Sequence, residues 1–576
     1  MSLFHRLTGR AALIIATISV LSVLILGPLI FLVFSSFRAS EGGLPFGPSS
    51  TWTLQNYVDV FLQPSTYRLL WTTFIFSFGA LVVSFVGAAA LAWLIERTNL
   101  PFRSTWFVLI VAAIGIPNII LAIAWGFLLN PTNGLINIYL RALFGLSGPG
   151  PLDLYTLPGM IFVQGLTLIP ITYLFLAAGF RSLDSGLEEA AAASGARFDA
   201  IARRVTLPLM TPAFLAAFVY QFVAVIDSFD IPFLIGLRGG VPVLTAQIFI
   251  TVVPSSGLPD YGLAASYSLL QMALAAIPML LYVRVLSQGY RYETITGRGY
   301  QPRRVSLGRW KFPALIVVCM YVLASFVLPA LILLWVSIQP YYAPPSPEAL
   351  ARVTLSAYWR LIQDKSVHQA VWNTVLLGLS VGAITLTLGT LVSWIVIRLR
   401  TRARLALDAL SFLPQAMPGV LIGLSVLLIY ISLDRWLPIP IYGTIWIIVI
   451  GLATQYIPLA TRLMSAGIIQ IGVELEEAAQ ASGASLFATM RRVVLPLVRP
   501  ALANGFLLVF VATTKSLTLP LMLISRDGVV LSSLVYQHYE RASAGTTGVL
   551  GVALVLIAVV AALLLRRANV QGTAMT

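Results

Sequence analysis

Long apolar stretches alternate with short polar segments along the whole chain. A helix of about 20 apolar residues is long enough to cross a bilayer. By this criterion we predict twelve spans, and the fifth and eleventh are interrupted by polar residues. Their approximate bounds are 11–36, 67–95, 105–129, 155–180, 212–236, 260–286, 312–338, 369–397, 405–432, 441–468, 501–525 and 546–565. The first is too long for a typical signal peptide, so we expect it to be retained.

Composition changes this picture little, because it too indicates a membrane protein. Of the 576 residues, 59% are hydrophobic and 10% are charged, whereas soluble domains carry about a quarter charged residues. The net charge of +15 could indicate a nucleic-acid partner. A bias of Lys and Arg toward cytoplasmic loops explains this positive charge better. We therefore expect the chain to contact membrane lipid and to bind no nucleic acid. The single cysteine, Cys319, excludes an intrachain disulfide and a thiolate-cluster metal site.

The distribution of Lys and Arg orients the spans. With a cytoplasmic N-terminus, the predicted cytoplasmic segments hold 25 Lys and Arg residues and the external segments hold 10. Cytoplasmic loops are the richer ones in membrane proteins. We therefore expect a multi-pass protein with both termini in the cytoplasm.

One polar segment occurs twice between these spans. The copies run from Leu187 to Pro212 and from Leu475 to Pro500, and 17 of their 26 positions are identical at a constant offset of 288. Both copies fall on the predicted cytoplasmic side. A polar segment this similar between divergent membrane spans predicts two docking sites for two like partners.

The repeat extends beyond this segment. Pro117 matches Pro418 at an offset of 301, and from Pro170 and Pro458 onward the offset is 288. The first half therefore holds 13 extra residues, which we place in the external loop around 130–153.

Each half carries six spans, so the two halves have the same orientation and form a parallel 6+6 repeat. We predict a first domain over 1–286 and a second over 312–576. The basic, glycine-containing segment 287–311 is expected to be a cytoplasmic linker between them.

The repeated segment has the pattern of a helix, a bend and a second helix. Glu188 and Glu189 lie in a first turn, where carboxylates suit the positive end of the helix dipole. Small residues follow, which let a partner approach closely, and Gly195 permits a sharp break. The residues singled out are Glu188, Glu189, Ala190, Ala191, Gly195, Arg203, Arg204, Leu207 and Pro208, with Glu476, Glu477, Ala478, Ala479, Gly483, Arg491, Arg492, Leu495 and Pro496 in the second copy.

The segment resembles the EAA loop of ABC importer permeases. Glu189-Ala190-Ala191, then Gly195, then Leu207-Pro208 follow that family's spacing, although Val205 stands where its usual Ile would be. The resemblance covers the whole chain and implies a type I importer of a bacterial inner membrane, with two permease domains fused. It also implies that the first short helix of each loop is a coupling helix seated in a cytoplasmic ATPase.

The partners follow from the same resemblance. The chain has no G-x-x-x-x-G-K-[ST] phosphate-binding loop, so we expect a non-catalytic subunit without a cofactor of its own. ATP and Mg²⁺ would be bound by two copies of a separate ATPase. A periplasmic or lipid-anchored substrate-binding protein would dock on the outer face.

The cargo is less well defined than the class. Fused permease chains of this length look like the ferric iron importer group, with thiamine, polyamine and phosphonate permeases as relatives. The stretch from Lys515 to Pro520 is similar to a Lys-Glu-Leu-Pro signature of iron permeases, although Ser516 replaces the Glu and the proline is displaced. Ferric iron is therefore our leading expectation.

Ionisable residues within spans are candidates for the translocation path or its gate, because they are costly in lipid. The repeat places Asp227 opposite Lys515, and Asp230 opposite Thr518. The charged pair could be a gate, a structural ion pair or a solvated interfacial pair. Weaker candidates, which are more often helix–helix hydrogen bonders than ligands, are Gln164, Gln415 and Gln455.

Two other classes of function compete with the importer. A secondary transporter with a 6+6 repeat would need no ATPase and would couple Asp227 and Lys515 to protons. A channel or scaffold subunit would also leave the duplicated loop unused. Copurification of an ATPase would separate the importer from both.

If Asp227 and Lys515 pair, Asp227→Lys combined with Lys515→Asp should recover more transport than either single variant, because each single variant leaves two like charges together. Uptake by cells that express the three variants at matched levels measures this. A double variant that transports no better than the singles would contradict contact between the two residues.

Overall fold

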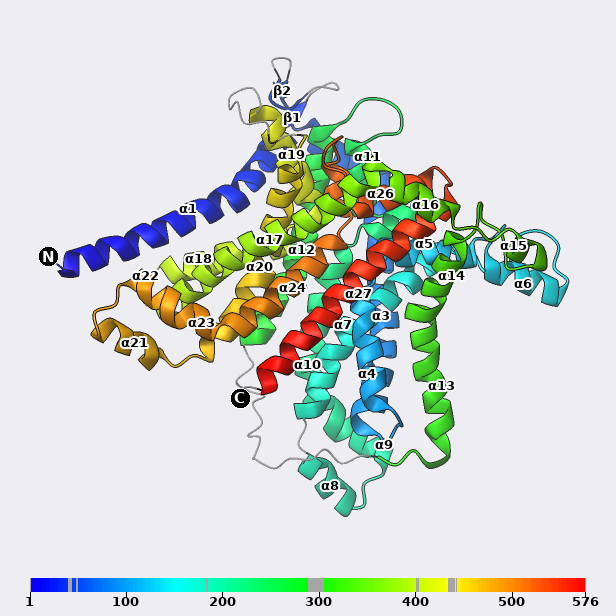
Figure 1. Cartoon of the computed structure of the whole chain (residues 1–576), viewed down its shortest axis with the longest axis horizontal. Coiled ribbons are helices and arrows are strands. Elements are labelled where there is room, and N and C mark those ends of the chain that lie inside the picture. The colour runs from blue at the N-terminus through cyan, green and yellow to red at the C-terminus, as the bar shows by residue number, and fades with distance from the viewer. Residues whose placement is uncertain are drawn as a thin grey trace. The chain divides into compact units, whose positions relative to one another are not determined.

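The computed structural model describes residues 2–39, 44–47, 50–182, 185–287, 305–399, 403–433, 441 and 443–574. Within these ranges the chain is almost entirely helical (Figure 1). Two short strands, β1 (Arg38–Ala39) and β2 (Thr51–Trp52), form an antiparallel pair in which Arg38 faces Trp52. Most of the predicted linker, together with Arg400 and Arg402, lies outside the described residues.

The described residues form the helices α1 to α27, of which α1 to α12 belong to the first half of the sequence and α13 to α27 to the second. Those of the first half are α1 (Ser2–Ser36), α2 (Gln55–Leu62), α3 (Pro64–Arg97), α4 (Arg103–Ala112), α5 (Asn118–Leu129), α6 (Leu135–Phe144), α7 (Leu157–Ser182), α8 (Ser185–Ala193), α9 (Phe198–Ile201), α10 (Leu207–Ile226), α11 (Leu244–Val252) and α12 (Tyr261–Ser287). Those of the second half are α13 (Lys311–Val322), α14 (Leu328–Ser337), α15 (Pro347–Ala351), α16 (Ser356–Gln363), α17 (Lys365–Arg398), α18 (Ala403–Phe412), α19 (Gly419–Leu433), α20 (Ile445–Ile469), α21 (Val473–Ala481), α22 (Leu486–Thr489), α23 (Leu495–Leu497), α24 (Arg499–Thr514), α25 (Thr518–Met522), α26 (Leu531–Glu540) and α27 (Ala544–Ala574).

Each of the twelve predicted spans contains at least one helix. Among the described residues, seven helices are long and apolar enough to cross a membrane, and three bent helix pairs raise this number to ten. The other two predicted spans contain the shorter apolar stretches Ala217–Ile226 and Ala544–Val560. The fold is therefore that of an all-α, multi-span membrane protein.

Two of the bends occur at the prolines that match across the repeat. The pair around Pro117 bends by 99° and the pair around Pro418 by 104°. A proline disfavours helical backbone at the residue before it, and Ile116 and Met417 are both extended, with ψ of 124° and 112°. The same local cause thus gives the same bend in both halves.

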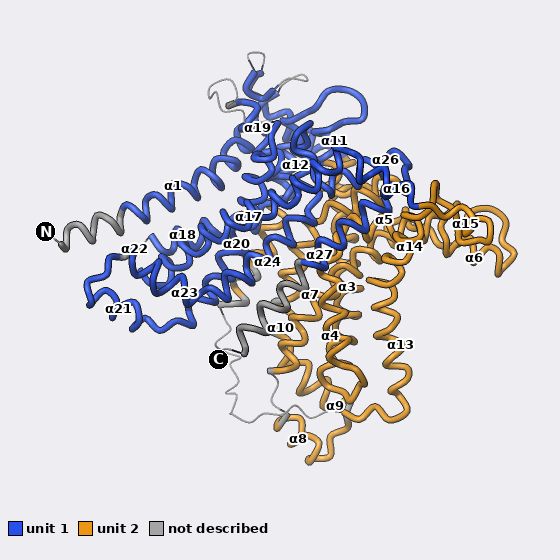
Figure 2. The backbone as a smooth tube through the Cα atoms, viewed as in Figure 1, with its two compact units in different colours: residues 1–63, 248–272, 355–576 blue, residues 64–247, 273–354 orange. Residues whose placement is uncertain are grey.

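The compact units of the structure do not follow the order of the sequence. One unit comprises residues 1–63, 248–272 and 355–576, and the other comprises 64–247 and 273–354 (Figure 2). In the first unit α1, from the start of the chain, packs against α18 and α19 of the second sequence half. In the other unit α13 packs against α3 and α4, and α14 packs against α5. The unit that contains most of the second sequence half therefore includes α1 from the first half, and the unit that contains most of the first half includes α13 and α14 from the second.

Within each unit the helix that precedes a repeated loop packs most extensively against the long helix of the same sequence half. These pairs are α3 with α7 and α17 with α20. Small residues let the helices approach, as expected between membrane helices. A Cβ added at Gly87 would come within 2.7 Å of Ile169, and one added at Gly389 would come within 2.9 Å of the backbone of Ala460.

The segment 130–153, in which we predict the extra residues of the first half, contains α6. The side chain of Asn137 is completely buried and holds this loop together. Its amide nitrogen donates to the carbonyl oxygens of Leu129, Asn130 and Leu152 at 3.2, 3.0 and 2.6 Å. Its oxygen accepts from the Leu152 N–H at 3.1 Å. Residues 434–440 and 442, in the corresponding loop of the second half, are outside the described residues.

The interrupted fifth and eleventh spans break in the same way. After α10 and α24 the chain leaves the helix and later starts α11 and α26, respectively. The first N–H of each new helix donates to a threonine hydroxyl: Leu244 to Thr73 at 3.0 Å, and Leu531 to Thr374 at 2.9 Å. Since these threonines also match at offset 301, each break is held by an equivalent contact.

Candidate functional site

Each repeated loop is a helix, a glycine turn and a second helix, as predicted. In the first copy α8 ends near Gly195, which has φ +81°, and in the second α21 ends near Gly483, which has φ +88°. The N–H of Ala196 donates to the carbonyl of Ala191 at 3.1 Å, and that of Ala484 to Ala479 at 3.0 Å. These bonds satisfy the last carbonyls of each helix in the manner of a glycine-terminated helix.

Neither glycine is constrained by space. No atom lies within 4 Å of a Cβ built at Gly195 or at Gly483. The left-handed backbone therefore favours glycine at these two positions. Close packing does not, since the space around each glycine is open.

The two adjacent glutamates of each loop face in different directions. Glu189 and Glu477 are exposed, whereas the side chains of Glu188 and Glu476 are only 18% and 4% exposed. An exposed glutamate is available to a partner, but a buried one requires a partner within the protein. The residues of the motif exposed beside Glu189 and Glu477 are Ala190, Gly195, Arg203, Arg204, Leu207 and Pro208, and Ala478, Gly483, Arg491, Arg492 and Pro496. Ala191, Ala479 and Leu495 are half-buried.

The partner of Glu188 is an arginine at the end of α3. Arg97, with a side chain 4% exposed, forms an ion pair with Glu188. The hydroxyl of Thr206, in the returning part of the same loop, donates to the other carboxylate oxygen at 2.7 Å. Glu188 thus joins both sides of the first loop to the end of a long helix.

The partner of Glu476 is the equivalent arginine of α17. Arg398 lies 301 positions after Arg97, and its Nε donates to Glu476 at 2.8 Å. The indole N–H of Trp394 donates to the same carboxylate at 3.0 Å. The Nη2 of Arg398 also donates to the carbonyls of Ile468 and Ile471, at 3.1 and 2.6 Å, where α20 ends. Neither arginine is among the site residues predicted from the sequence, although the two match at the same offset of 301 as Pro117 and Pro418.

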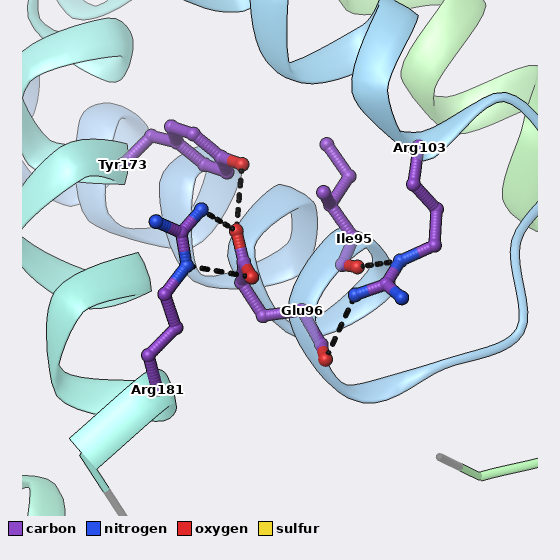
Figure 3. A network of polar contacts seen from close by, with 5 residues as sticks. All are labelled: Ile95, Glu96, Arg103, Tyr173 and Arg181. Atoms are coloured by element: carbon purple, nitrogen blue, oxygen red, sulfur yellow. Dashed lines mark hydrogen bonds and ion pairs between the residues drawn. The ribbon is translucent and has the colours of Figure 1, made fainter. Parts of the chain in front are cut away.

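The first half has an additional charged cluster beside its loop (Figure 3). The carboxylate of Glu96 accepts two bonds from Arg181, at 2.9 and 2.6 Å, and one from the hydroxyl of Tyr173 at 3.2 Å. Arg103 donates to the carbonyls of Ile95 and Glu96, which closes the end of α3. The bidentate Glu96–Arg181 pair ties the end of α7 to the end of α3.

The Glu96–Arg181 pair of this cluster has no charged counterpart at the matching positions of the second half. At the repeat offsets, Glu96 corresponds to Ile397, Tyr173 to Thr461 and Arg181 to Ile469. The two loops are therefore alike in their turn and in their arginine–glutamate pair, but they differ in how the preceding helix is attached.

The proposed path residues lie around the broken spans. Asp227 and Lys515 are the residues at which α10 and α24 end, Asp230 is 8% exposed, and Thr518 begins α25. Asp227 and Lys515 belong to different compact units, so their pairing remains a prediction.

The three glutamines differ in their contacts. Gln164, in α7, accepts a bond from the Ser228 hydroxyl at 2.7 Å next to the break. Gln415 lies in the short turn Leu413–Ala416, and Gln455 lies within α20. Among the described residues, no group of three or more His, Cys, Asp or Glu is placed to hold a metal ion.

A known family matches most of the chain. The family is described as binding-protein-dependent transport system inner membrane component, and its match covers residues 88–337 and 383–571. Each of the two matched ranges contains one of the repeated loops, and the first also extends through α13 and α14.

The relatives include permeases of several named cargoes. The ferric transport system permease protein of Actinobacillus pleuropneumoniae is 24% identical over 433 residues, which are 74% of this chain and 60% of that protein. A putative ferric transport system permease protein of Haemophilus influenzae is 24% identical over 416 residues, which are 71% of this chain and 62% of that protein. The sulfate transport system permease protein of Escherichia coli is 33% identical over 175 residues, 29% of this chain and 62% of that protein. The chain therefore spans less than two thirds of the length of these relatives.

A solved structure is also similar in part. It is a bacterial ABC transporter involved in the import of the acidic polysaccharide alginate, with a TM-score of 0.37 and 16% identity. The similarity covers 47% of this chain and 98% of that one.

Proposed function

Because this chain belongs to the family of binding-protein-dependent transport system inner membrane components, we propose that it forms the translocation path of an ATP-driven ABC importer. It is a multi-pass protein of the inner membrane, with the family's domain present in both halves. The observation that carries the proposal is the pair of repeated loops, each with an exposed glutamate and alanine on its first helix and a glycine turn.

Each loop provides a small, smooth docking surface. The exposed side of the helix carries Glu189 and Ala190 in one copy and Glu477 and Ala478 in the other, just after the first turn, to which Glu188 and Glu476 belong. Small side chains allow close approach, and the exposed carboxylate offers a charged hydrogen-bond acceptor to a partner. Two such surfaces fit two copies of one ATPase, or the two subunits of a dimer, on the cytoplasmic side together with both termini.

The chemistry of energy supply lies outside this chain. The sequence has no phosphate-binding loop of the Walker type. In the proposed complex the partner ATPase binds ATP and Mg²⁺ and hydrolyses the nucleotide, while this chain is a non-catalytic subunit. A substrate-binding protein delivers the cargo at the outer face.

Ferric iron is the cargo we propose. Two relatives aligned over more than 70% of this chain are named as ferric transport permeases. Shorter alignments to sulfate permeases, and one to a diacetylchitobiose uptake permease, show that related permeases serve other cargoes. The ferric assignment therefore rests on the length of the alignment, and thiamine, polyamine, phosphonate and sulfate are the competing cargoes.

The coupling role predicts a specific effect at the loop glycines. Gly195→Asp combined with Gly483→Asp should abolish transport yet leave insertion intact. The added side chains meet open space, and the strain of a left-handed aspartate costs only about 1 kcal/mol. Each substitution, however, places a charge on the docking surface. Uptake and membrane content of the variant measure the two effects.

Gly257→Asp is the matched control for this variant. Gly257 is exposed, has φ +90°, and has no atom within 4 Å of an added Cβ, but it lies between α11 and α12. It should transport normally. Normal uptake by the double loop variant would refute the coupling role.

Ligand-stimulated ATP hydrolysis tests the class of function and its cargo together. The chain would be coexpressed with its neighbouring ATPase and binding-protein genes and reconstituted in liposomes. Ferric iron should raise the rate of hydrolysis, whereas thiamine, polyamine, phosphonate and sulfate should not. Stimulation by another ligand would replace iron as the cargo. The lack of a copurifying ATPase would instead favour an ion-coupled secondary transporter.

A further inference from the structure

In each unit three helices meet at the base of a repeated loop, and an arginine lies at the meeting point. Arg97 is the last residue of α3, and Arg398 is the last residue of α17. Both side chains are largely buried, at 4% and 13% exposed. Each pairs with the inward-facing first glutamate of its loop.

We propose that Arg97 and Arg398 are positioning residues that make the loop, the helix before it and the long helix move as one body. This inference rests on the proposed coupling function, because it explains how a displacement of the loop reaches the membrane helices. Neither arginine is expected to touch ATP, cargo or the ATPase. Each acts through the carboxylate that it holds.

In the second half one residue makes both connections. The guanidinium of Arg398 donates from Nε to Glu476 of α21 and from Nη2 to the carbonyls of Ile468 and Ile471, where α20 ends. A guanidinium suits this task because its donors point in several fixed directions at once. Loss of this side chain would remove both of these connections at once, and would leave the bond from Trp394 to Glu476 and the packing of α20 against α17.

In the first half two neighbouring residues share the task. Arg97 holds Glu188 of α8, while Glu96 holds Arg181 at the end of α7. Loss of either residue leaves the other connection in place. The two halves should therefore respond unequally to the loss of a single side chain.

The end of α3 carries one more connection. The N–H of Val305 donates to the carbonyl of Arg97 at 2.8 Å, and the N–H of Leu307 donates to the side-chain oxygen of Asn99 at 3.0 Å. Residues 305–307 are the described end of the predicted linker. The first junction thus has further attachments besides its two ion pairs, which protects it against a single substitution.

A purely structural ion pair is the alternative. Burying two charges is costly because both lose their hydration, and a buried pair is often no more stabilising than packed apolar residues. A structural role would make each variant less stable, but it would not change how efficiently the remaining complexes link ATP hydrolysis to the binding protein. Nor would it predict that the two halves differ in a particular order.

The test compares four variants in the full complex of this chain, the ATPase and the binding protein in nanodiscs. They are Arg398→Gln, Arg97→Gln, Glu96→Gln combined with Arg97→Gln, and Arg404→Gln as a control. Arg404 is an exposed arginine of α18, also on the predicted cytoplasmic side. Amide hydrogen exchange reports loop opening, and the ratio of ATP hydrolysis with and without the ligand-loaded cognate binding protein reports coupling.

Arg398→Gln should raise exchange in Val473–Ala481 on the order of tenfold, because hydrogen bonds to a charged group are lost. It should also lower the coupling ratio. Arg97→Gln should have a smaller effect on Ser185–Ala193 until Glu96→Gln is added. Unchanged exchange and coupling in Arg398→Gln, equal to those of Arg404→Gln, would overturn the proposal.

Charge exchange gives a second, independent discrimination. Arg97→Glu with Glu188→Arg should recover coupling, because it restores the pair. Arg398→Glu with Glu476→Arg should not, since a carboxylate would then face the carbonyls of Ile468 and Ile471. Equal recovery in both halves, or recovery in neither, would contradict the division of roles proposed here.

The two hypotheses fail in distinguishable ways. If no ATPase binds even the unmodified chain, the importer proposal is wrong. Amide exchange in the chain without partners still decides whether the arginines hold the loops. If the ATPase binds and is stimulated but the Arg398 and Arg97 variants behave as the control, only the positioning role is wrong.

Discussion

The structure depends on a buried ion pair at the base of each repeated loop. A helix that leaves the membrane exposes its last carbonyl groups, and a loop outside the membrane has few apolar contacts to hold it. Arg97 and Arg398, at the ends of α3 and α17, hold the loops through Glu188 and Glu476, and Arg398 also donates to the carbonyls where α20 ends. Because the paired glutamate faces inward, its neighbour in the sequence faces outward, and the loop presents a defined surface.

The rest of each unit supports this junction. The helix pairs α3–α7 and α17–α20 pack closely through glycines, which sets the distance between the helix ends that the arginine must bridge. The bends at Pro117 and Pro418 and the threonine-held breaks repeat in both halves, so the halves share one architecture. The halves differ in the charged pair Glu96–Arg181 of the first half. The matching residues of the second half, Ile397 and Ile469, are apolar.

Much of this arrangement could be predicted from the sequence, because it has a local cause. Apolar runs define the spans, Pro117 and Pro418 predict the bends, and Gly195 and Gly483 predict the turns. The arginine–glutamate pairs could not be derived in the same way, since residues about 80 to 90 positions apart meet only when the helices pack. The packing of α1 and α13 against helices of the other sequence half could not be predicted either, because hydropathy identifies a span but not the helices that it packs against. The sequence does hold one indication of these arginines, because Arg97 and Arg398 match at the repeat offset of 301.

Site-specific cross-linking tests the central claim, that both loops seat an ATPase, most directly. The single native cysteine allows a Cys319→Ala background in which Ala190→Cys and Ala478→Cys, both at exposed positions, carry the reactive thiols. We expect each single-cysteine variant to give a cross-linked product with the coexpressed ATPase. A chain that carries both cysteines should become joined to two ATPase subunits. Ser255→Cys, exposed beyond α11, should give no such product. Cross-linking from only one loop, or from neither, would contradict the account.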